Sequence, residues 1–169
     1  MTRRMAAFVW LAAFSAASVA AAPNCDTADR YVQKMLLRSG QTVVIAEGDC
    51  EARSLGSYSV RLYNADGGDD ATFYVAGVIL ERDGTIDAVR LADLDGDDRD
   101  EVVVVIRSVG SGGYLSAQAL AIANKKIEVR SSVKGLPNDA DPIAALTKTS
   151  KADKAKSTGK YHDPVGGAR

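Results

Sequence analysis

Residues 93–101 form a strongly acidic stretch whose spacing could bind a hard cation. The carboxylates follow a one, three, five, nine pattern that could surround calcium with oxygen ligands. They are Asp93, Asp95, Asp97 and Glu101. A helix–loop–helix calcium site also needs glycine at its sixth position and glutamate at its twelfth, where this chain has Asp98 and Val104. We therefore favour a solvated Asp–Gly turn and expect neither a metal nor a cofactor.

A second candidate site is the glycine-rich stretch between two apolar runs. Its glycines allow positive φ angles and a close approach of the backbone to a partner, while a serine and a tyrosine add a hydroxyl and an amphipathic ring. The residues of interest are Ser108, Gly110, Ser111, Gly112, Gly113 and Tyr114. A phosphate loop would require a Gly-Lys-Ser/Thr ending and a following helix, and both are missing. We predict an exposed binding loop here, with a plain turn as the simpler alternative.

No set of residues matches a catalytic arrangement, so we expect a binding protein and not an enzyme. The single histidine, His162, lies in a polar C-terminal stretch, which leaves no core base for a nucleophile. The carboxylates gather in one turn instead of facing each other across a pocket.

The N-terminus has the layout of a secretory signal peptide. Arg3 and Arg4 precede an apolar, alanine-rich run over residues 6–22, and small residues offer a cleavage site before Ala21. We predict a signal peptide over residues 1–20 and a periplasmic or secreted mature chain, with an uncleaved anchor as the alternative. After cleavage, no later segment is expected to cross a membrane.

The mature chain contains two cysteines, Cys25 and Cys50. An even number of cysteines in an exported chain favours one disulfide over metal or nucleophilic chemistry. On the loop-entropy model, such a bridge stabilises the fold by roughly 3 kcal/mol.

Charge divides the mature chain into two parts. Residues 21–147 have the length of one domain and carry 13 basic and 20 acidic side chains, a net charge of −7. This charge argues against nucleic acid and favours a basic partner. Residues 148–169 are rich in Lys, Ser, Thr and Gly, so we predict a flexible lysine-rich tail after a short helical turn at residues 141–146.

From Arg30 onward, short β-type runs alternate with turns, which predicts an all-β domain of about eight strands. The runs are residues 30–37, 42–46, 58–63, 71–80, 85–91, 101–107, 115–123 and 127–133. Alternation places Tyr58, Val60 and Leu62 on one face of their strand. Residues 102–106 are apolar without alternation, which suits a central strand covered on both faces. We expect an antiparallel β-sandwich or a barrel-like closure.

Turn residues between these runs predict antiparallel neighbours. The turns are Ser39-Gly40, Asp66-Gly67-Gly68, Asp83-Gly84 and Asn124-Lys125.

The glycine-rich loop resembles a motif of a known family. Ser111-Gly112-Gly113-Tyr114 is similar to the Ser-Gly-x-Tyr inhibitory loop of the periplasmic inhibitors of invertebrate-type (I-type) lysozyme. Residues 47–49, 53–63 and 82–86 are also similar to that family, and the similarity spans roughly residues 31–146. The sequence of the lysine-rich tail is less similar to that family.

This resemblance implies a β-sandwich, often a homodimer, that inserts the loop into the active-site cleft of a lysozyme. Such a cleft presents two carboxyl groups, which the Ser111 hydroxyl and the glycine amides could bind while the Tyr114 ring covers apolar cleft wall. The resemblance therefore implies a lysozyme of the invertebrate type as the expected partner. The competing hypothesis is a calcium-binding β-domain for adhesion or structural interaction. That hypothesis would call for repeats of the aspartate motif, and the chain has one copy.

Overall fold

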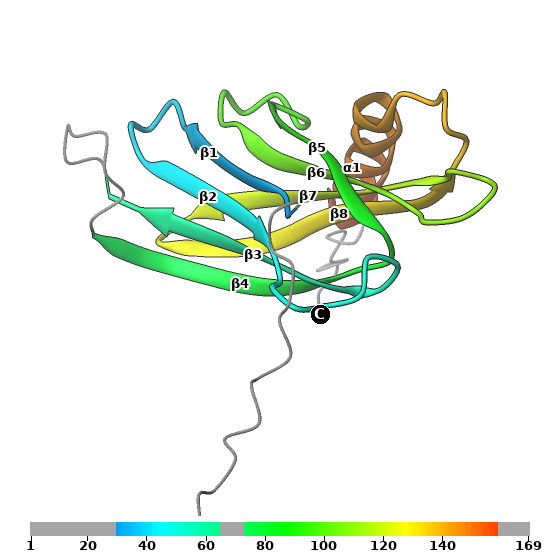
Figure 1. Ribbon diagram of the computed structural model, residues 1–169. Helices are drawn as coiled ribbons and strands as arrows, with labels where there is room; N and C mark the ends of the chain where they lie inside the picture. The colour runs from blue at the N-terminus through cyan, green and yellow to red at the C-terminus, as the bar shows by residue number, and fades with distance from the viewer. Residues whose placement is uncertain (1–29, 65–72, 159–169) are drawn as a thin grey trace, which may run out of the picture.

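The computed structural model describes residues 30–64 and 73–158, with the side chains of residues 153–158 left out (Figure 1). The predicted signal peptide, Cys25 and the turn Asp66-Gly67-Gly68 lie outside the described residues. No helix in the described ranges is long and apolar enough to span a bilayer.

The described strands form two four-stranded antiparallel sheets, each in sequence order. The first sheet contains β1 (Val32–Leu36), β2 (Thr42–Glu47), β3 (Gly56–Tyr63) and β4 (Tyr74–Arg82). The second contains β5 (Thr85–Ala92), β6 (Glu101–Arg107), β7 (Leu115–Ala123) and β8 (Lys126–Leu136), and helix α1 (Pro142–Thr158) follows. Each predicted run overlaps one strand, with bounds that differ by up to three residues, so the all-β prediction is confirmed.

The two sheets pack face to face around one apolar core. Tyr58, Val60 and Leu62 are all 0% exposed, which confirms the face predicted by alternation. They belong to the same cluster as Val102 and Ile106 of the second sheet. The sheets are also joined by a polar contact, because the buried Glu47 carboxylate accepts a 2.6 Å hydrogen bond from the backbone N–H of Ile86.

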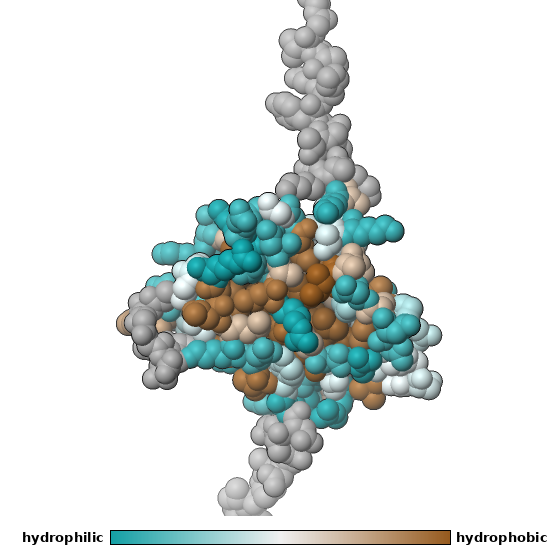
Figure 2. All heavy atoms as spheres, turned by 90° about the horizontal axis from the view of Figure 1, so that it is seen from above, coloured by the Kyte–Doolittle hydropathy of each residue, from teal (hydrophilic) through white to brown (hydrophobic). Residues whose placement is uncertain are grey.

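The barrel-like alternative is wrong. Each sheet ends in two edge strands, and β1 and β5 lie near one another at the upper side of the molecule without pairing (Figure 1). From above, apolar side chains are visible between hydrophilic ones on this side (Figure 2). The partly buried Met35 and Leu91 pack at the margin of the core.

Helix α1 covers the outer face of the second sheet. Val103 and Val105 of β6 pack with Leu146, which is fully buried, and with Ile143 of the same helix. Because its other face lies in the core between the sheets, β6 is buried on both sides, as its unbroken apolar run predicted.

The helix corrects the first part of the predicted tail, residues 148–158, while residues 159–169 lie outside the described residues. Asp141 caps its first turn by accepting hydrogen bonds from the N–H groups of Ile143 and Ala144, at 2.9 and 3.3 Å. Instead of ending as a short turn before a flexible tail at Lys148, the helix continues to Thr158. Tertiary packing of its first turns provides the nucleus, after which alanine and lysine, both good helix formers, extend it. Composition alone pointed to a tail because the extension has few core-forming side chains.

Two predicted turns behave differently. Asn124 and Lys125 have positive φ angles of 51° and 61° and join the paired strands β7 and β8, as predicted. Asp83-Gly84 was expected to join antiparallel neighbours, but it links β4 of one sheet to β5 of the other. The preceding residue, Arg82, is fully buried and donates to the Gly84 carbonyl, which holds the chain in this crossing between layers.

Cys50 follows β2 and is not a free thiol. Since Cys25 lies outside the described residues, the Cys25–Cys50 disulfide stays a prediction.

Candidate functional site

The predicted binding loop, residues 108–114, connects β6 to β7 at one end of the stacked sheets, at the right of Figure 1. Strand direction places the β4–β5 turn and the β8–α1 connection at the same end. Tyr114 is 55% exposed and Val109 is 57% exposed, and Ser111 is exposed between them. The loop therefore presents the hydroxyl and the aromatic ring to solvent.

Within the loop, the glycines are needed for two different reasons. Gly113 has a φ of +53°, a conformation that L-residues rarely adopt. At Gly112, an added Cβ would lie 2.3 Å from a carbon of the Tyr114 ring, so this ring rests directly against the loop backbone. The loop is closed at its base by a 2.9 Å hydrogen bond from the Ser108 N–H to the Tyr114 carbonyl.

Arg107, the last residue of β6, supports the loop from below. Its Nε and Nη2 atoms donate to the two carboxylate oxygens of Asp87 at 2.8 and 3.1 Å, and Nη1 donates to the Gly113 carbonyl at 3.3 Å. The hydrogen bonds to Asp87 raise the pKa of the Arg107 guanidinium, which remains charged. Sequence reasoning missed Asp87 as a site residue. Only the register could have found it, because the irregularity between Ile86 and Ala88 decides where this side chain points.

The β4–β5 turn packs against the same base. An added Cβ at Gly84 would lie 2.0 Å from the carbonyl oxygen of Arg107 and 2.9 Å from the Cα of Ser108. Only glycine allows the two backbones to approach this closely. The turn and the loop therefore form one packed unit.

The acidic turn lies at the opposite end of the sheets. Asp93 accepts hydrogen bonds from the backbone N–H groups of Gly96, Asp98 and Asp97 at 2.7, 3.0 and 3.2 Å. Although partial burial opposes it, these donors lower the pKa of Asp93. Carboxylate oxygens of Asp93, Asp95 and Glu101 lie within 4.8 Å of one another, and Glu101 accepts from the Leu94 N–H at 2.9 Å. The backbone thus folds around these acids as an Asp–Gly turn, and the expected absence of a bound metal stays a prediction.

The Glu101 carboxyl provides a test of this turn. Burial, with smaller contributions from Asp95, Asp97 and Asp93, raises the pKa of Glu101 above its ordinary 4.5. The folded state therefore favours the protonated acid. The resulting stability is fully present below the pKa of the unfolded chain and is lost as pH rises through the higher folded pKa.

We expect Glu101→Gln to raise the melting temperature at neutral pH, because it keeps an oxygen for the Leu94 N–H and removes the buried charge. The gain should vanish below the ordinary pKa of 4.5. Thermal unfolding across this pH range measures it, with exposed Asp98→Asn in the same turn as the control. A lower melting temperature at neutral pH would show that the ionised Glu101 carboxylate stabilises the turn. Micromolar calcium binding by calorimetry would show that the turn is a cation site.

Comparisons with known proteins point to one family. The model of the family described as periplasmic lysozyme inhibitor of I-type lysozyme (PliI) matches residues 29–150. The crystal structure of PliI from Aeromonas hydrophila is similar, with 39% sequence identity and a TM-score of 0.65, over 69% of this chain and 98% of that one. A. hydrophila PliI in complex with Meretrix lusoria lysozyme is also similar, with 40% identity and a TM-score of 0.64, over 69% of this chain and 94% of that one.

No curated protein sequence matches this chain. The family model nevertheless covers most of the described residues, including both sheets and the whole loop. On this evidence, the chain belongs to the PliI family of periplasmic lysozyme inhibitors, which are inhibitor proteins and not enzymes.

Proposed function

We propose that this protein inhibits an I-type lysozyme by inserting the loop of residues 108–114 into the active-site cleft of the enzyme. The observation that carries the proposal is the exposed pair Ser111 and Tyr114 on a glycine loop whose base is fixed by hydrogen bonds. The A. hydrophila relative was crystallised with an invertebrate lysozyme, which supports the same class of partner.

The chemistry of the two surfaces is complementary. A lysozyme cleft contains two carboxyl groups separated by space for a sugar ring. The Ser111 hydroxyl and the exposed glycine N–H groups are hydrogen-bond donors for these carboxyls, and the Tyr114 ring supplies apolar area. Because the loop is closed by its own hydrogen bonds, little conformational entropy is lost on docking.

The test is inhibition of cell-wall lysis by three classes of lysozyme. The mature protein is mixed with an I-type, a chicken-type and a goose-type enzyme, and the turbidity of a bacterial suspension is followed. We expect inhibition of the I-type enzyme, with weaker or no effect on the others. Full activity of all three enzymes in the presence of excess protein would overturn the proposal.

A further inference from the structure

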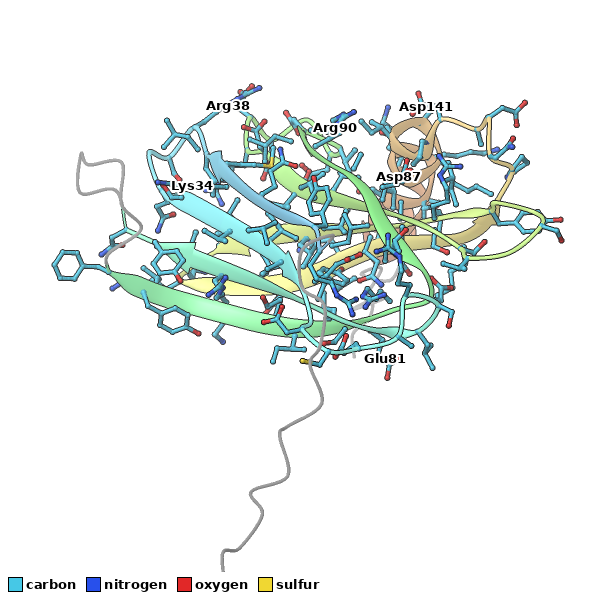
Figure 3. All side chains as sticks on the ribbon, in the orientation of Figure 1. Lys34, Arg38, Glu81, Asp87, Arg90 and Asp141 are labelled. Carbon is cyan, nitrogen blue, oxygen red and sulfur yellow. The ribbon has the colours of Figure 1, made fainter. Side chains whose placement is uncertain are left out.

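We propose that Arg107 is the positioning residue of the binding loop and that it acts through the pair it forms with Asp87. This inference rests on the proposed function of the loop. Asp87 lies on β5, where Figure 3 labels it, and Arg107 lies at the end of β6, so the pair joins neighbouring strands at the base of the loop.

The Arg107 guanidinium connects strand β5 to the glycine-rich loop. Two of its nitrogens hold the Asp87 carboxylate in a bidentate pair, which fixes the plane of the group. With the guanidinium held in that plane, the third nitrogen meets the Gly113 carbonyl, one residue before Tyr114. Arg107 therefore connects β5 to the part of the loop that carries the aromatic ring.

Apart from a 3.4 Å hydrogen bond from the Gly113 N–H to the Gly110 carbonyl and the Tyr114 ring against Gly112, the tip of the loop has little other support among the described residues. An added Cβ at Gly110 would meet nothing within 4 Å, and one at Gly113 would meet only the Arg107 guanidinium and the Asn138 side chain, at 3.9 and 4.0 Å. A segment with three glycines has many accessible backbone conformations. Without the third hydrogen bond of Arg107, a smaller fraction of molecules would hold the loop in its docking conformation, and the apparent affinity falls in proportion to that fraction.

The pair is not expected to contribute much to the stability of the fold. The Arg107 and Asp87 side chains are 38% and 36% exposed, and ion pairs in such positions contribute little to folding. A positioning role thus predicts a specific pattern, in which lysozyme binding weakens while the melting temperature hardly changes.

The experiment compares Arg107→Gln, Asp87→Asn and the double variant with the parent protein. Arg38→Gln is the matched control, because Arg38 pairs with Asp100 at 3.1 Å at the opposite end of the molecule (Figure 3). Affinity for an I-type lysozyme is measured by surface plasmon resonance, and amide hydrogen exchange is measured over residues 108–114. We expect each single variant to bind about tenfold more weakly and to exchange faster in the loop. The double variant should bind no more weakly than Arg107→Gln, because both changes remove the same unit.

Three results would overturn the inference. If Arg107→Gln binds like the parent while Ser111→Ala binds more weakly, the loop has its proposed function but Arg107 does not position it. If affinity falls with unchanged loop exchange, or if the two single effects add, Arg107 acts by touching the lysozyme directly. If Ser111→Ala and Tyr114→Ala also bind like the parent, the proposed function of the loop itself has failed.

Discussion

Tyr114→Ala is expected to weaken lysozyme inhibition by about a hundredfold or more, with the fold intact. The ring is 55% exposed and lies against the backbone of Gly112 instead of in the core. Aromatic side chains at the centre of an interface often cost 2 kcal/mol or more when truncated, and about 2.7 kcal/mol corresponds to a hundredfold change in affinity. Inhibition curves against an I-type lysozyme, together with thermal unfolding, measure the two quantities separately.

Companion variants separate the ring from the hydroxyl groups. Tyr114→Phe keeps the ring and should retain most of the inhibition. Ser111→Ala removes a donor to a charged cleft group, which should cost roughly 1.5 to 3 kcal/mol, or about ten- to a hundredfold. Tyr74→Ala is the control, because Tyr74 is also an exposed tyrosine, 62% exposed, but lies at the start of β4 away from the loop.

Normal folding and parent-like inhibition by both Tyr114→Ala and Ser111→Ala would show that another surface binds the lysozyme. A drop in melting temperature with unchanged inhibition would mean that these residues only shape the turn between β6 and β7.

The strands could be predicted from sequence because their signals are local. Alternation in β3 and the continuous apolar run in β6 each report how many faces of the strand are buried, and the burial of Tyr58 and Val104 agrees. The Asp83-Gly84 turn shows the limit of such signals. Its local chemistry is the same in a hairpin and in a crossing between sheets, and the choice depends on the buried Arg82, which also binds carbonyls of residues 52, 53 and 57 elsewhere in the chain.

The candidate site also has features that the local sequence predicts and features that depend on distant residues. The exposure of Ser111 and Tyr114 on a loop could be predicted because glycine content marks such a loop, and their binding role stays a prediction from the family motif. Asp87 could not be predicted, because its contact with Arg107 depends on the pairing of β5 with β6 and on the irregularity beside Ile86. The length of α1 was also missed, since two packed residues near its start, Ile143 and Leu146, support a helix whose later residues need no core.

The largest loss of stability is expected from replacing Arg82. This side chain is 0% exposed and lies where the β2–β3 connection meets the β4–β5 turn. It donates to backbone carbonyls at up to 3.1 Å and lies 3.5 Å from the Glu51 carboxylate. The carbonyls that it binds belong to Ala52, Arg53, Ser57 and Gly84. One guanidinium thus donates hydrogen bonds to the backbone carbonyls of the β2–β3 connection, which has little regular secondary structure of its own.

Arg82→Met is expected to lower the free energy of unfolding by about 3 to 5 kcal/mol, since it leaves one buried and three part-buried carbonyls without this donor and removes the cation beside the Glu51 carboxylate. Arg82→Lys should be nearly as damaging, because one ammonium group cannot reach the four carbonyls in their different directions. Urea unfolding measures both, and Arg61→Ala on the exposed side of β3 is the control, with an expected change within about 0.5 kcal/mol.

If Arg82→Met remains soluble and folded, its loop should also bind lysozyme more weakly, because Gly84 lies against the base of that loop. A loss of stability no larger than that of Arg61→Ala would show that the carbonyls of this connection find other donors, and that Arg82 does not hold the two sheets and the loop base together.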